Sequence, residues 1–264
     1  MTDERLLNQS RQKLLQTIFN RTKNRGQLQY LTDKRETRLY WESTSSTKIN
    51  QIPLKQTSKE LGEYLTGFWE GDGYIQGLES GYTDIGLVQK LPEILFNLQD
   101  LLEGGNIYYK KTANFYQLAF GGRQACQVLS ILAPNLVGAS RLKQLSPFLK
   151  VLDIEARLQC PTPSWFVGFW DAEGTSSHSS YTTLSVSNKD KTTINQIYKL
   201  WKSGHINSRR DGVYIWSLSS APKYSRVFQV VYNLLLDKSL NKEKRVLLRS
   251  EHRLESFTEG KLED

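Results

Sequence analysis

The sequence predicts an α/β (α+β) fold made of two similar half-domains, each with the element order αββαββα. Three observations support this prediction. The segment at 65–73 recurs 101 positions later, at 166–174. The similarity continues at a spacing of 99, without a gap, from residue 85 to residue 120. In each copy, helical, alternating and turn-forming segments follow one another in the same order.

The repeated segment has the same order of residue types in both copies. It reads LTGFWEGDG at 65–73 and FVGFWDAEG at 166–174, so Gly-Phe-Trp is followed by an acid, a small residue, a second acid and glycine. We expect a helix to begin just before each copy, because Thr57-Ser58-Lys59-Glu60 has the spacing of a capping box and Pro163-Ser164 offers an N-cap. Each helix is expected to end at its Asp-Gly or Glu-Gly pair.

The residues after each motif helix predict two strands, a helix, a hairpin and a closing helix. Clean alternation of apolar and polar residues at 182–188 predicts a strand, as does its counterpart at 84–90. Asp211-Gly212 is a strong signal for a two-residue turn between strands at 205–210 and 213–218. The expected helices cover residues 91–102 and 191–202, with closing helices at 124–132 and 223–236.

These elements divide the chain into five parts. They are a basic N-terminal extension (1–57), a first repeat (58–157), a linker (158–163), a second repeat (164–255) and a C-terminal tail (256–264). Residues 1–60 hold twelve Lys and Arg against six Asp and Glu, which is most of the net charge of +8. The extension is therefore either a solvated tail or an arm that contacts phosphates.

The composition excludes several classes of protein. With 38% hydrophobic and 23% charged residues over 264 positions, the chain is neither disordered nor fibrous. No stretch reaches the roughly 18 apolar residues of a membrane span, and the first residues lack a secretory signal, so we expect a soluble protein with no membrane partner. Two cysteines and three histidines, without a CxxC pair, exclude a disulfide framework and a structural zinc site.

Small residues predict that the two motif helices pack against each other. On a helix, Gly67 and Gly71 share one face, as do Gly168 and Ala172. Residues without bulky side chains at this spacing let two backbones approach closely. Because each copy has one such face, we expect the helices to meet at a pseudo-twofold axis and to form the interface between the half-domains.

This packing would set two acids side by side. Asp72 and Glu173 lie in the last turns of their helices, where the helix dipole disfavours negative charge by about 0.3–1 kcal/mol. Mutual repulsion adds to that cost, so the pair requires cations. Carboxylate oxygens in a cleft favour Mg²⁺, which supports phosphodiester chemistry. An acid followed by glycine is also an ordinary helix end, but its presence in both copies favours the functional interpretation.

Two other pairs in the motif are expected to be structural. Glu70 and Asp171 lie about 200° round the helix from the final acids, so they are expected to be surface or capping residues. Trp69 and Trp170 are expected in the core rather than in a recognition surface.

The strands predict a polar β-saddle. Ile107 and Ile206 are expected on the core face of their strands, and Leu184 and Val186 on the core face of theirs. Because side chains alternate along a strand, the neighbouring residues lie on the other face. Two such sheets form a saddle that fits the DNA major groove, with a merely solvated face as the alternative. The expected DNA-contacting residues are Asn106, Tyr108, Lys110, Ser185, Ser187, His205, Asn207 and Arg209.

The paired motifs resemble the LAGLIDADG homing endonuclease family in its single-chain, two-repeat form. The resemblance covers roughly residues 58–255. It implies saddle-shaped half-domains and a monomer that cuts both strands of a DNA site across the minor groove. It also implies divalent metal, Mg²⁺ with Ca²⁺ or Mn²⁺ as alternatives, at the final acids Asp72 and Glu173, helped by the carbonyl groups of Gly71 and Ala172.

The resemblance assigns further residues to catalysis. In this family a polar residue at the end of the second strand commonly orders the attacking water, and Gln89 and Asn188 match that position. A lysine after the closing helix is typical near the site, and Lys242 matches it. The first copy has Leu152 there, with Lys150 as a weaker match. The expected catalytic residues are therefore Asp72, Glu173, Gln89, Asn188 and Lys242.

Two classes of function stay open at this point. The first is a site-specific, metal-dependent endonuclease acting on double-stranded DNA and promoting intron mobility. The second is a binding protein on the same scaffold, either an RNA maturase that assists its host intron or a DNA-binding protein that does not cleave. Retention of both motif acids favours the nuclease. A glycosidase pair of carboxylates would explain neither the duplicated helix nor the basic saddle. The resemblance further implies an organelle, chloroplast or mitochondrion, where such proteins are often encoded by introns.

Overall fold

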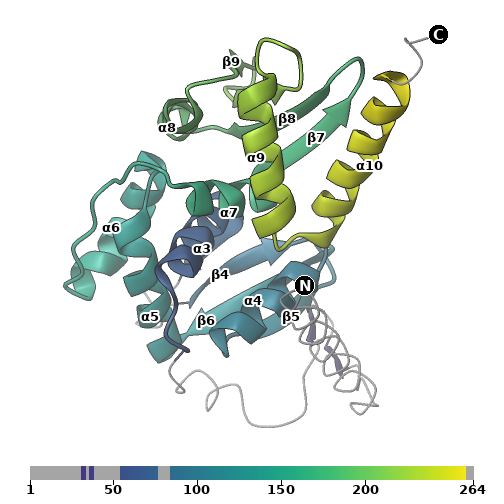
Figure 1. The fold of residues 1–264 in the computed structure, drawn as a ribbon. Coiled ribbons are helices and arrows are strands. Elements are labelled where there is room, and N and C mark those ends of the chain that lie inside the picture. Colours follow the sequence, from purple (N-terminus) through teal and green to yellow (C-terminus); the bar gives the residue numbers. More distant parts are fainter. Residues whose placement is uncertain (1–30, 34–35, 39–53, 77–83, 260–264) are drawn as a thin grey trace, which may run out of the picture.

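A computed structural model describes residues 31–33, 36–38, 54–76 and 84–259 of the chain (Figure 1). Most of the predicted extension at 1–57 and the loop at 77–83 lie outside these residues. Within the extension, β1 (Leu31–Asp33) and β2 (Glu36–Arg38) pair antiparallel. Among the described segments, no helix is both long enough and apolar enough to cross a membrane.

The first half-domain starts with the helix that carries the first motif. Its elements are α3 (Lys59–Asp72), β3 (Gly73–Gln76), β4 (Asp84–Gln89), α4 (Glu93–Leu102), β5 (Asn106–Lys110), β6 (Phe115–Gly121), α5 (Gly122–Leu132), a short 3₁₀ turn (Ala133–Asn135) and α6 (Ala139–Val151).

The second half-domain repeats this order. Its elements are α7 (Pro163–Glu173), β7 (Gly174–His178), β8 (Thr182–Asn188), α8 (Lys191–Trp201), β9 (His205–Ser208), β10 (Tyr214–Ser219), α9 (Ser225–Lys238) and α10 (Lys242–Glu259).

The predicted αββαββα order is confirmed in both halves, and each half carries one helix more than predicted. The additional helices are α6 and α10. The first contains Pro147, a residue that normally argues against a helix interior, and the second is dominated by charged residues.

Each half-domain builds one four-stranded antiparallel sheet, and the two sheets have matching topology. Their strand orders are β3-β4-β6-β5 and β7-β8-β10-β9. Gly73 pairs with Leu87 in the first sheet, and Gly174 pairs with Val186 in the second. This common register places each motif helix in the same position relative to its own sheet, and α3 and α7 lie side by side between the two sheets (Figure 1).

The core is formed by the motif helices and the inner faces of the sheets. Ile85 and Leu87 of β4 are buried, as are Leu184 and Val186 of β8. The motif tryptophans, Trp69 and Trp170, are almost fully buried, which confirms their predicted place in the core.

Two local features differ from the sequence-based expectation. Thr162, rather than Ser164, caps α7 by accepting a hydrogen bond from the Trp165 backbone N–H (3.2 Å), because Pro163 occupies the first helical position. The turn between β9 and β10 is longer than two residues, since Arg209 N–H donates to the Val213 carbonyl (2.7 Å) and leaves residues 210–212 in the loop. Gly212 adopts φ +79°, the left-handed conformation that such three-residue turns require.

Candidate active site at the interface of the motif helices

The two motif helices are in direct backbone contact. A Cβ atom added to Gly67 would lie 1.9 Å from the carbonyl oxygen of Trp165, and one added to Gly168 would lie 2.0 Å from that of Tyr64. Both distances are far below any real contact, so neither position can hold a side chain while the helices stay where they are. The predicted packing through small residues at the interface is confirmed.

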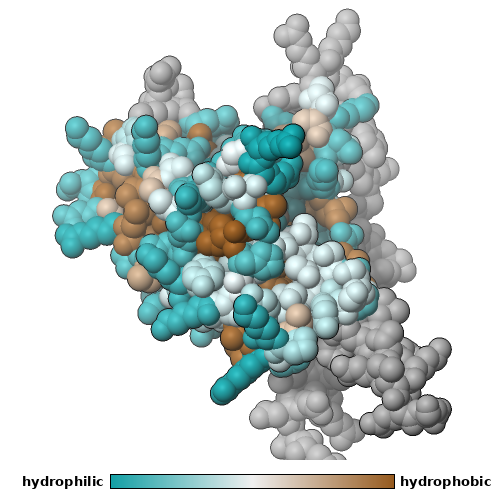
Figure 2. All heavy atoms as spheres, turned by 90° about the horizontal axis from the view of Figure 1, so that it is seen from above, coloured by the Kyte–Doolittle hydropathy of each residue, from teal (hydrophilic) through white to brown (hydrophobic). Residues whose placement is uncertain are grey.

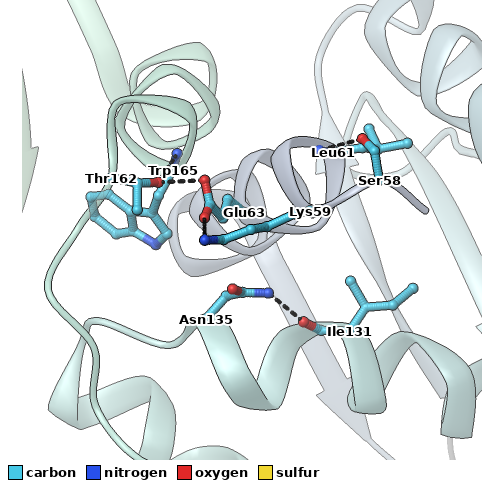
Figure 3. A network of polar contacts seen from close by, with 8 residues as sticks. All are labelled: Ser58, Lys59, Leu61, Glu63, Ile131, Asn135, Thr162 and Trp165. Atoms are coloured by element: carbon cyan, nitrogen blue, oxygen red, sulfur yellow. Dashed lines mark hydrogen bonds and ion pairs between the residues drawn. The ribbon is translucent and has the colours of Figure 1, made fainter.

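Polar contacts fix the N-terminal ends of the same two helices. Thr162 Oγ1, just before α7, donates to Glu63 Oε2 of α3 at 2.8 Å, and Lys59 Nζ lies 3.8 Å from the other carboxylate oxygen (Figure 3). Ser58 caps α3 itself by accepting from Leu61 N–H at 3.2 Å. The two helices are therefore held together at this end as well as in the middle.

At the other end, the interface brings the final acids of the two motifs together. A Cβ added to Gly71 would lie 2.5 Å from the Ala172 Cβ and 3.0 Å from Glu173 Cγ, so the Glu173 side chain passes directly over the end of α3. Burial raises the pKa of the Glu173 carboxyl, and the negative charge of Asp72 raises it further. The two carboxylates are close enough to repel each other.

Asp72 and Glu173 differ in their polar partners. Burial raises the pKa of the Asp72 carboxyl, while Lys244 and a hydrogen bond donated by the Gln89 side-chain amide oppose this rise. Asn188 occupies the matching place in the second half, but its side-chain oxygen accepts from the Asp190 backbone N–H at 2.8 Å. The structure thus brings Gln89 to its acid, whereas it engages Asn188 with the start of α8.

Two cations from the additional helices lie at the ends of the motif helices. Arg141 of α6 donates to the carbonyl groups of Glu70 (2.9 Å), Gly71 (2.8 Å) and Gly73 (3.1 Å). Lys244 of α10 donates to the carbonyl groups of Trp170 (2.8 Å), Asp171 (2.9 Å) and Ala172 (3.3 Å). Both cations therefore donate to carbonyl groups at the end of a motif helix, and their positive charge interacts favourably with the helix dipole.

Arg141 and Lys244 occupy equivalent places in the two halves. Each is the third residue of its helix, and each lies over the motif tryptophan, at 5.0 Å from the Trp69 ring and 5.1 Å from the Trp170 ring. Burial lowers the pKa of both cations, that of Lys244 to about 8, although the nearby acids oppose the shift. The acid pair was expected to require cations, and the chain itself places two beside it.

Glu70 and Asp171 are buried, so the expectation of surface positions is wrong. Their capping role exists, but it serves other helices. Glu70 accepts hydrogen bonds from the backbone N–H groups of Val137 (3.0 Å) and Gly138 (2.8 Å), just before α6. Asp171 accepts from the backbone N–H of Leu240 (2.8 Å), just before α10.

These two buried acids also cross the interface. Trp165 of α7 donates its indole N–H to Glu70 (2.8 Å), and Tyr64 of α3 donates its hydroxyl to Asp171 (2.7 Å). Burial raises the pKa of both carboxyls, that of Glu70 to about 7. Glu70 of α3 thus binds the start of α6, and Arg141 of α6 in turn binds the end of α3. In the second half, Asp171 and Lys244 connect α7 and α10 in the same way.

Lys242, the lysine expected near the site, is exposed at the first position of α10. Lys244, two residues later, is the lysine that reaches the end of α7. Lys150 is also exposed, and Arg141 takes the corresponding place in the first half. The sequence holds a weak signal for this pair, because Arg141 and Lys244 are basic residues 103 positions apart, close to the spacing of the repeat.

The outer faces of the sheets carry the residues expected to contact DNA. Asn106, Tyr108 and Lys110 alternate with residues that include the buried Ile107. On the same face, Gln117 donates to the Tyr74 hydroxyl, which donates to Asp84 at 3.3 Å. In the second sheet, Ser185 and Ser187 alternate with buried Leu184 and Val186, and Ser185 shares a hydrogen bond with Ser217 (3.0 Å). His205 and Asn207 are exposed on β9.

Arg209 lies just beyond β9 rather than within it, and it forms an ion pair with Asp211 at 2.9 Å. From above, polar and weakly hydrophilic side chains dominate the surface, while hydrophobic ones form separate patches (Figure 2).

An open cleft of about 730 Å³ adjoins the acid pair. It lies where the end of α3, the start of α6 and the β8–α8 junction meet. Glu173 and Asn188 line it from the second half-domain, and Gly71 and Arg141 line it from the first. The cleft gives a substrate access to one side of the acid pair.

The residues present fit a hard divalent cation. Asp72 and Glu173 supply carboxylate oxygens, and a bound cation would reverse the rise in their pKa values by favouring the ionised forms. In the described ranges no third His, Cys, Asp or Glu completes an all-protein cluster. This suits Mg²⁺, which usually keeps waters and substrate oxygens as ligands. The carbonyl groups of Gly71 and Ala172 already accept from Arg141 and Lys244, so a metal would have to share them.

Comparison with known sequences gives one relative of interest, and no family model matches the chain. The chain is 22% identical over 218 residues to the intron-encoded RNA maturase bI4 of Saccharomyces cerevisiae. The match covers 76% of this chain and 34% of the maturase, so the chain spans about a third of the length of this relative.

Solved structures share the fold over most of the chain. The I-LtrWI LAGLIDADG homing endonuclease bound to target DNA matches with a TM-score of 0.52 and 13% identity, over 77% of this chain and 92% of its own. The I-SmaMI LAGLIDADG homing endonuclease bound to cleaved DNA matches with a TM-score of 0.51 and 11% identity, over 80% and 92%. At these identities the likeness establishes the fold.

Proposed function

Because the chain has the two-repeat LAGLIDADG fold, we propose that it is a site-specific endonuclease that hydrolyses phosphodiester bonds in both strands of a DNA duplex. One observation carries this proposal. Asp72 and Glu173 meet at the ends of two helices that touch through Gly67 and Gly168, beside a cleft and two cations. The DNA-bound endonucleases that share the fold support a DNA substrate. Since one chain supplies both halves of the site, the active form is a monomer.

Asp72 and Glu173 would hold the metal, with the carbonyl groups of Gly71 and Ala172 as shared ligands. We propose Mg²⁺, with Ca²⁺ or Mn²⁺ as alternatives for binding or activity. When bound, such an ion neutralises phosphate charge, lowers the pKa of a bound water and stabilises the leaving oxygen.

The remaining residues position water and phosphate. In hydrolysis a water oxygen forms a bond to phosphorus, the water loses a proton, and the bond from phosphorus to the leaving sugar oxygen breaks. Gln89 uses its amide nitrogen to bond Asp72, which leaves its amide oxygen to accept from a water. In the second half we assign the ordering of water to the Asn188 amide nitrogen, because its oxygen already accepts from the Asp190 N–H.

We assign to Lys244 the role that the sequence suggested for Lys242. An ammonium group has three protons, and those of Lys244 serve three carbonyl groups. The bond to the Ala172 carbonyl, at 3.3 Å, is the longest of the three and therefore the easiest to exchange for a phosphate oxygen. Arg141 provides the corresponding positive charge in the first half.

The outer faces of the two sheets are proposed as the DNA-binding surface. Their polar side chains alternate with buried residues, which is the arrangement that lets a sheet present base-contacting groups on one side and a core on the other. The proposed contact residues are Asn106, Tyr108, Lys110, Ser185, Ser187, His205, Asn207 and Arg209.

A second candidate function is maturation of a host intron RNA. The observation that favours it is the match to the intron-encoded RNA maturase bI4. The name of this relative also supports the proposal that this chain is encoded within an intron. From the family resemblance we further propose that it assists intron mobility and acts in an organelle. Imaging a tagged protein in its host cells tests the last of these.

The test of the nuclease proposal is incubation of the protein with a library of duplex DNA that carries empty intron-insertion sites. Parallel reactions contain Mg²⁺, Ca²⁺ or a chelator, and Asp72→Asn is the control variant. We expect paired breaks at one sequence with Mg²⁺, and none with the chelator or the variant. Binding without breaks under every condition, together with acceleration of intron splicing, would support the maturase instead.

A further inference from the structure

We infer that the cleft beside Glu173 is a binding subsite for a backbone phosphate of one DNA strand, and that it makes the two strands unequal substrates. This inference rests on the proposed function, because it takes DNA as the partner. It adds a subsite that has no full counterpart in the other half of the molecule.

The cleft contains the groups that a phosphate requires. Arg141 lines it from α6, and Lys189 and Lys191 line it from the β8–α8 junction. Both lysines are exposed, so their ammonium groups can reach a ligand without unfolding anything. Lys191 Nζ also lies 5.5 Å from the centre of the ring of Tyr214, the residue that follows the cleft-lining Val213. Ammonium and guanidinium groups around one cavity suit a phosphate.

The acid between the two lysines does not cancel this charge. Asp190 accepts hydrogen bonds from the backbone N–H of Thr192 (2.9 Å), in the first turn of α8, and of Ser140 (3.0 Å), in the first turn of α6. Its carboxylate is thus compensated by two helix N-termini, and hydrogen bonding lowers its pKa despite partial burial. Asp190, which lines the cleft, thus joins the two half-domains beside it.

The first half-domain lacks this arrangement. At the spacing of 99, Lys90 corresponds to Lys189, but Leu91 and Pro92 stand where the second half has Asp190 and Lys191. Leu91 is exposed, and Pro92 begins α4 without a side-chain cap. The first half can therefore neither tie its helix ends together through an acid nor supply the second lysine.

The subsite lies beside the acid pair, so it affects the cutting of one DNA strand. Glu173 and Asn188 line the same cleft, so a phosphate held by Lys189 and Lys191 belongs to the strand that is cut beside Glu173. This strand is anchored by more positive charge than the other strand, which passes Gln89 and Lys90. We expect it to be cut first.

Phosphate ethylation interference tests the subsite without relying on cleavage. Duplexes that bind the protein in Ca²⁺ are selected from a random-sequence library and ethylated, and bound and free fractions are compared for each strand. The variants are Lys189→Ala with Lys191→Ala, and Lys90→Ala as the matched control. In the wild type, we expect one strand to show an interfering phosphate near the centre of the site that the other strand lacks.

The double variant is expected to lose that phosphate alone, while Lys90→Ala retains it. An unchanged pattern in the double variant, or equal losses on both strands, would overturn the inference. The same duplexes are then incubated with Mg²⁺ and the nicks are mapped by strand. The wild type is expected to nick one strand several-fold faster, and the double variant to lose this preference. If interference follows the expectation but no strand is cut, the nuclease proposal fails and the phosphate subsite stands.

Discussion

Gly67 of α3 and Trp165 of α7 approach so closely that even a methyl group on Gly67 would lie 1.9 Å from the Trp165 carbonyl oxygen. The same relationship recurs between Gly168 and Tyr64. These contacts set the separation of the two helices, and the helices in turn set the separation of Asp72 and Glu173. The geometry of the candidate site therefore depends on two hydrogen atoms in place of side chains.

Substitution of these glycines by alanine is expected to destabilise the protein severely. Gly67→Ala or Gly168→Ala forces a methyl group into backbone atoms that cannot move alone, which we expect to lower the free energy of unfolding by at least about 3 kcal/mol. Chemical denaturation measures this. Gly62→Ala is the control in the same helix, because its Cβ would meet Ile131 at an ordinary 3.4 Å and alanine favours the helix by about 1 kcal/mol. Equal losses in all three variants would contradict the account.

The buried carboxyl of Glu70 is expected to make stability depend on pH. Its pKa is about 7 in the folded protein against 4.5 for an ordinary glutamate, so between these values the folded state keeps a proton that the unfolded state releases. The free energy of unfolding should therefore fall as pH rises through this window, by up to about 3 kcal/mol from this group, and level off above it.

Glu70→Gln removes this titration, so urea unfolding should show a smaller loss of stability between about pH 5 and about pH 8 than in the wild type. Glu60→Gln, at an exposed position of α3, is the control and should keep the wild-type dependence. A Glu70→Gln variant with the wild-type dependence would show that another group is responsible.

Lys244, and not Lys242, is expected to matter for cutting. Lys244→Met removes the positive charge at the end of α7 and leaves three carbonyl groups without their donor, so the rate of strand cleavage should fall by at least about tenfold. Lys242→Met changes an exposed residue and should leave the rate near that of the wild type. Quench-flow cleavage assays compare the two. The reverse ranking would restore the assignment that the sequence suggested.

DNA affinity is expected to fall steeply with salt. A sheet surface that contacts phosphates releases counterions on binding, so the logarithm of the association constant should decrease linearly with the logarithm of the salt concentration. Lys110→Ala should reduce this slope by about one. Lys59→Ala, at the opposite end of α3 from Asp72, should not change it. A flat response in the wild type would argue against a phosphate-lined saddle.

The fold could be predicted well because the sequence contains two copies of the same half-domain. The motif, the alternation at 182–188 and the helices after it recur in order, so each copy supports the other. Packing of Gly67 against α7 also follows from residue size alone. The helices α6 and α10 were not predicted because Pro147 lies inside the first and charged residues dominate the second.

The surroundings of the acids could not be predicted in the same way. Helical periodicity places Glu70 and Asp171 on a different face from the final acids, but it does not say what covers that face. The backbone N–H groups before α6 and α10 cover it, from segments about 70 residues further along the chain. Arg141 and Lys244 lie on α6 and α10. Because these two helices were not expected, the positions of the two cations near the acids could not be predicted.

The central claim is that Asp72 and Glu173 form the active centre of a nuclease. The most direct test measures cleavage, DNA binding and thermal stability for Asp72→Asn and Glu173→Gln. Because both carboxyls have raised pKa values, their ionised forms cost stability, and the account predicts loss of cleavage with binding retained and with an equal or higher melting temperature. Cleavage at the wild-type rate in either variant, or loss of binding together with a lower melting temperature, would contradict it.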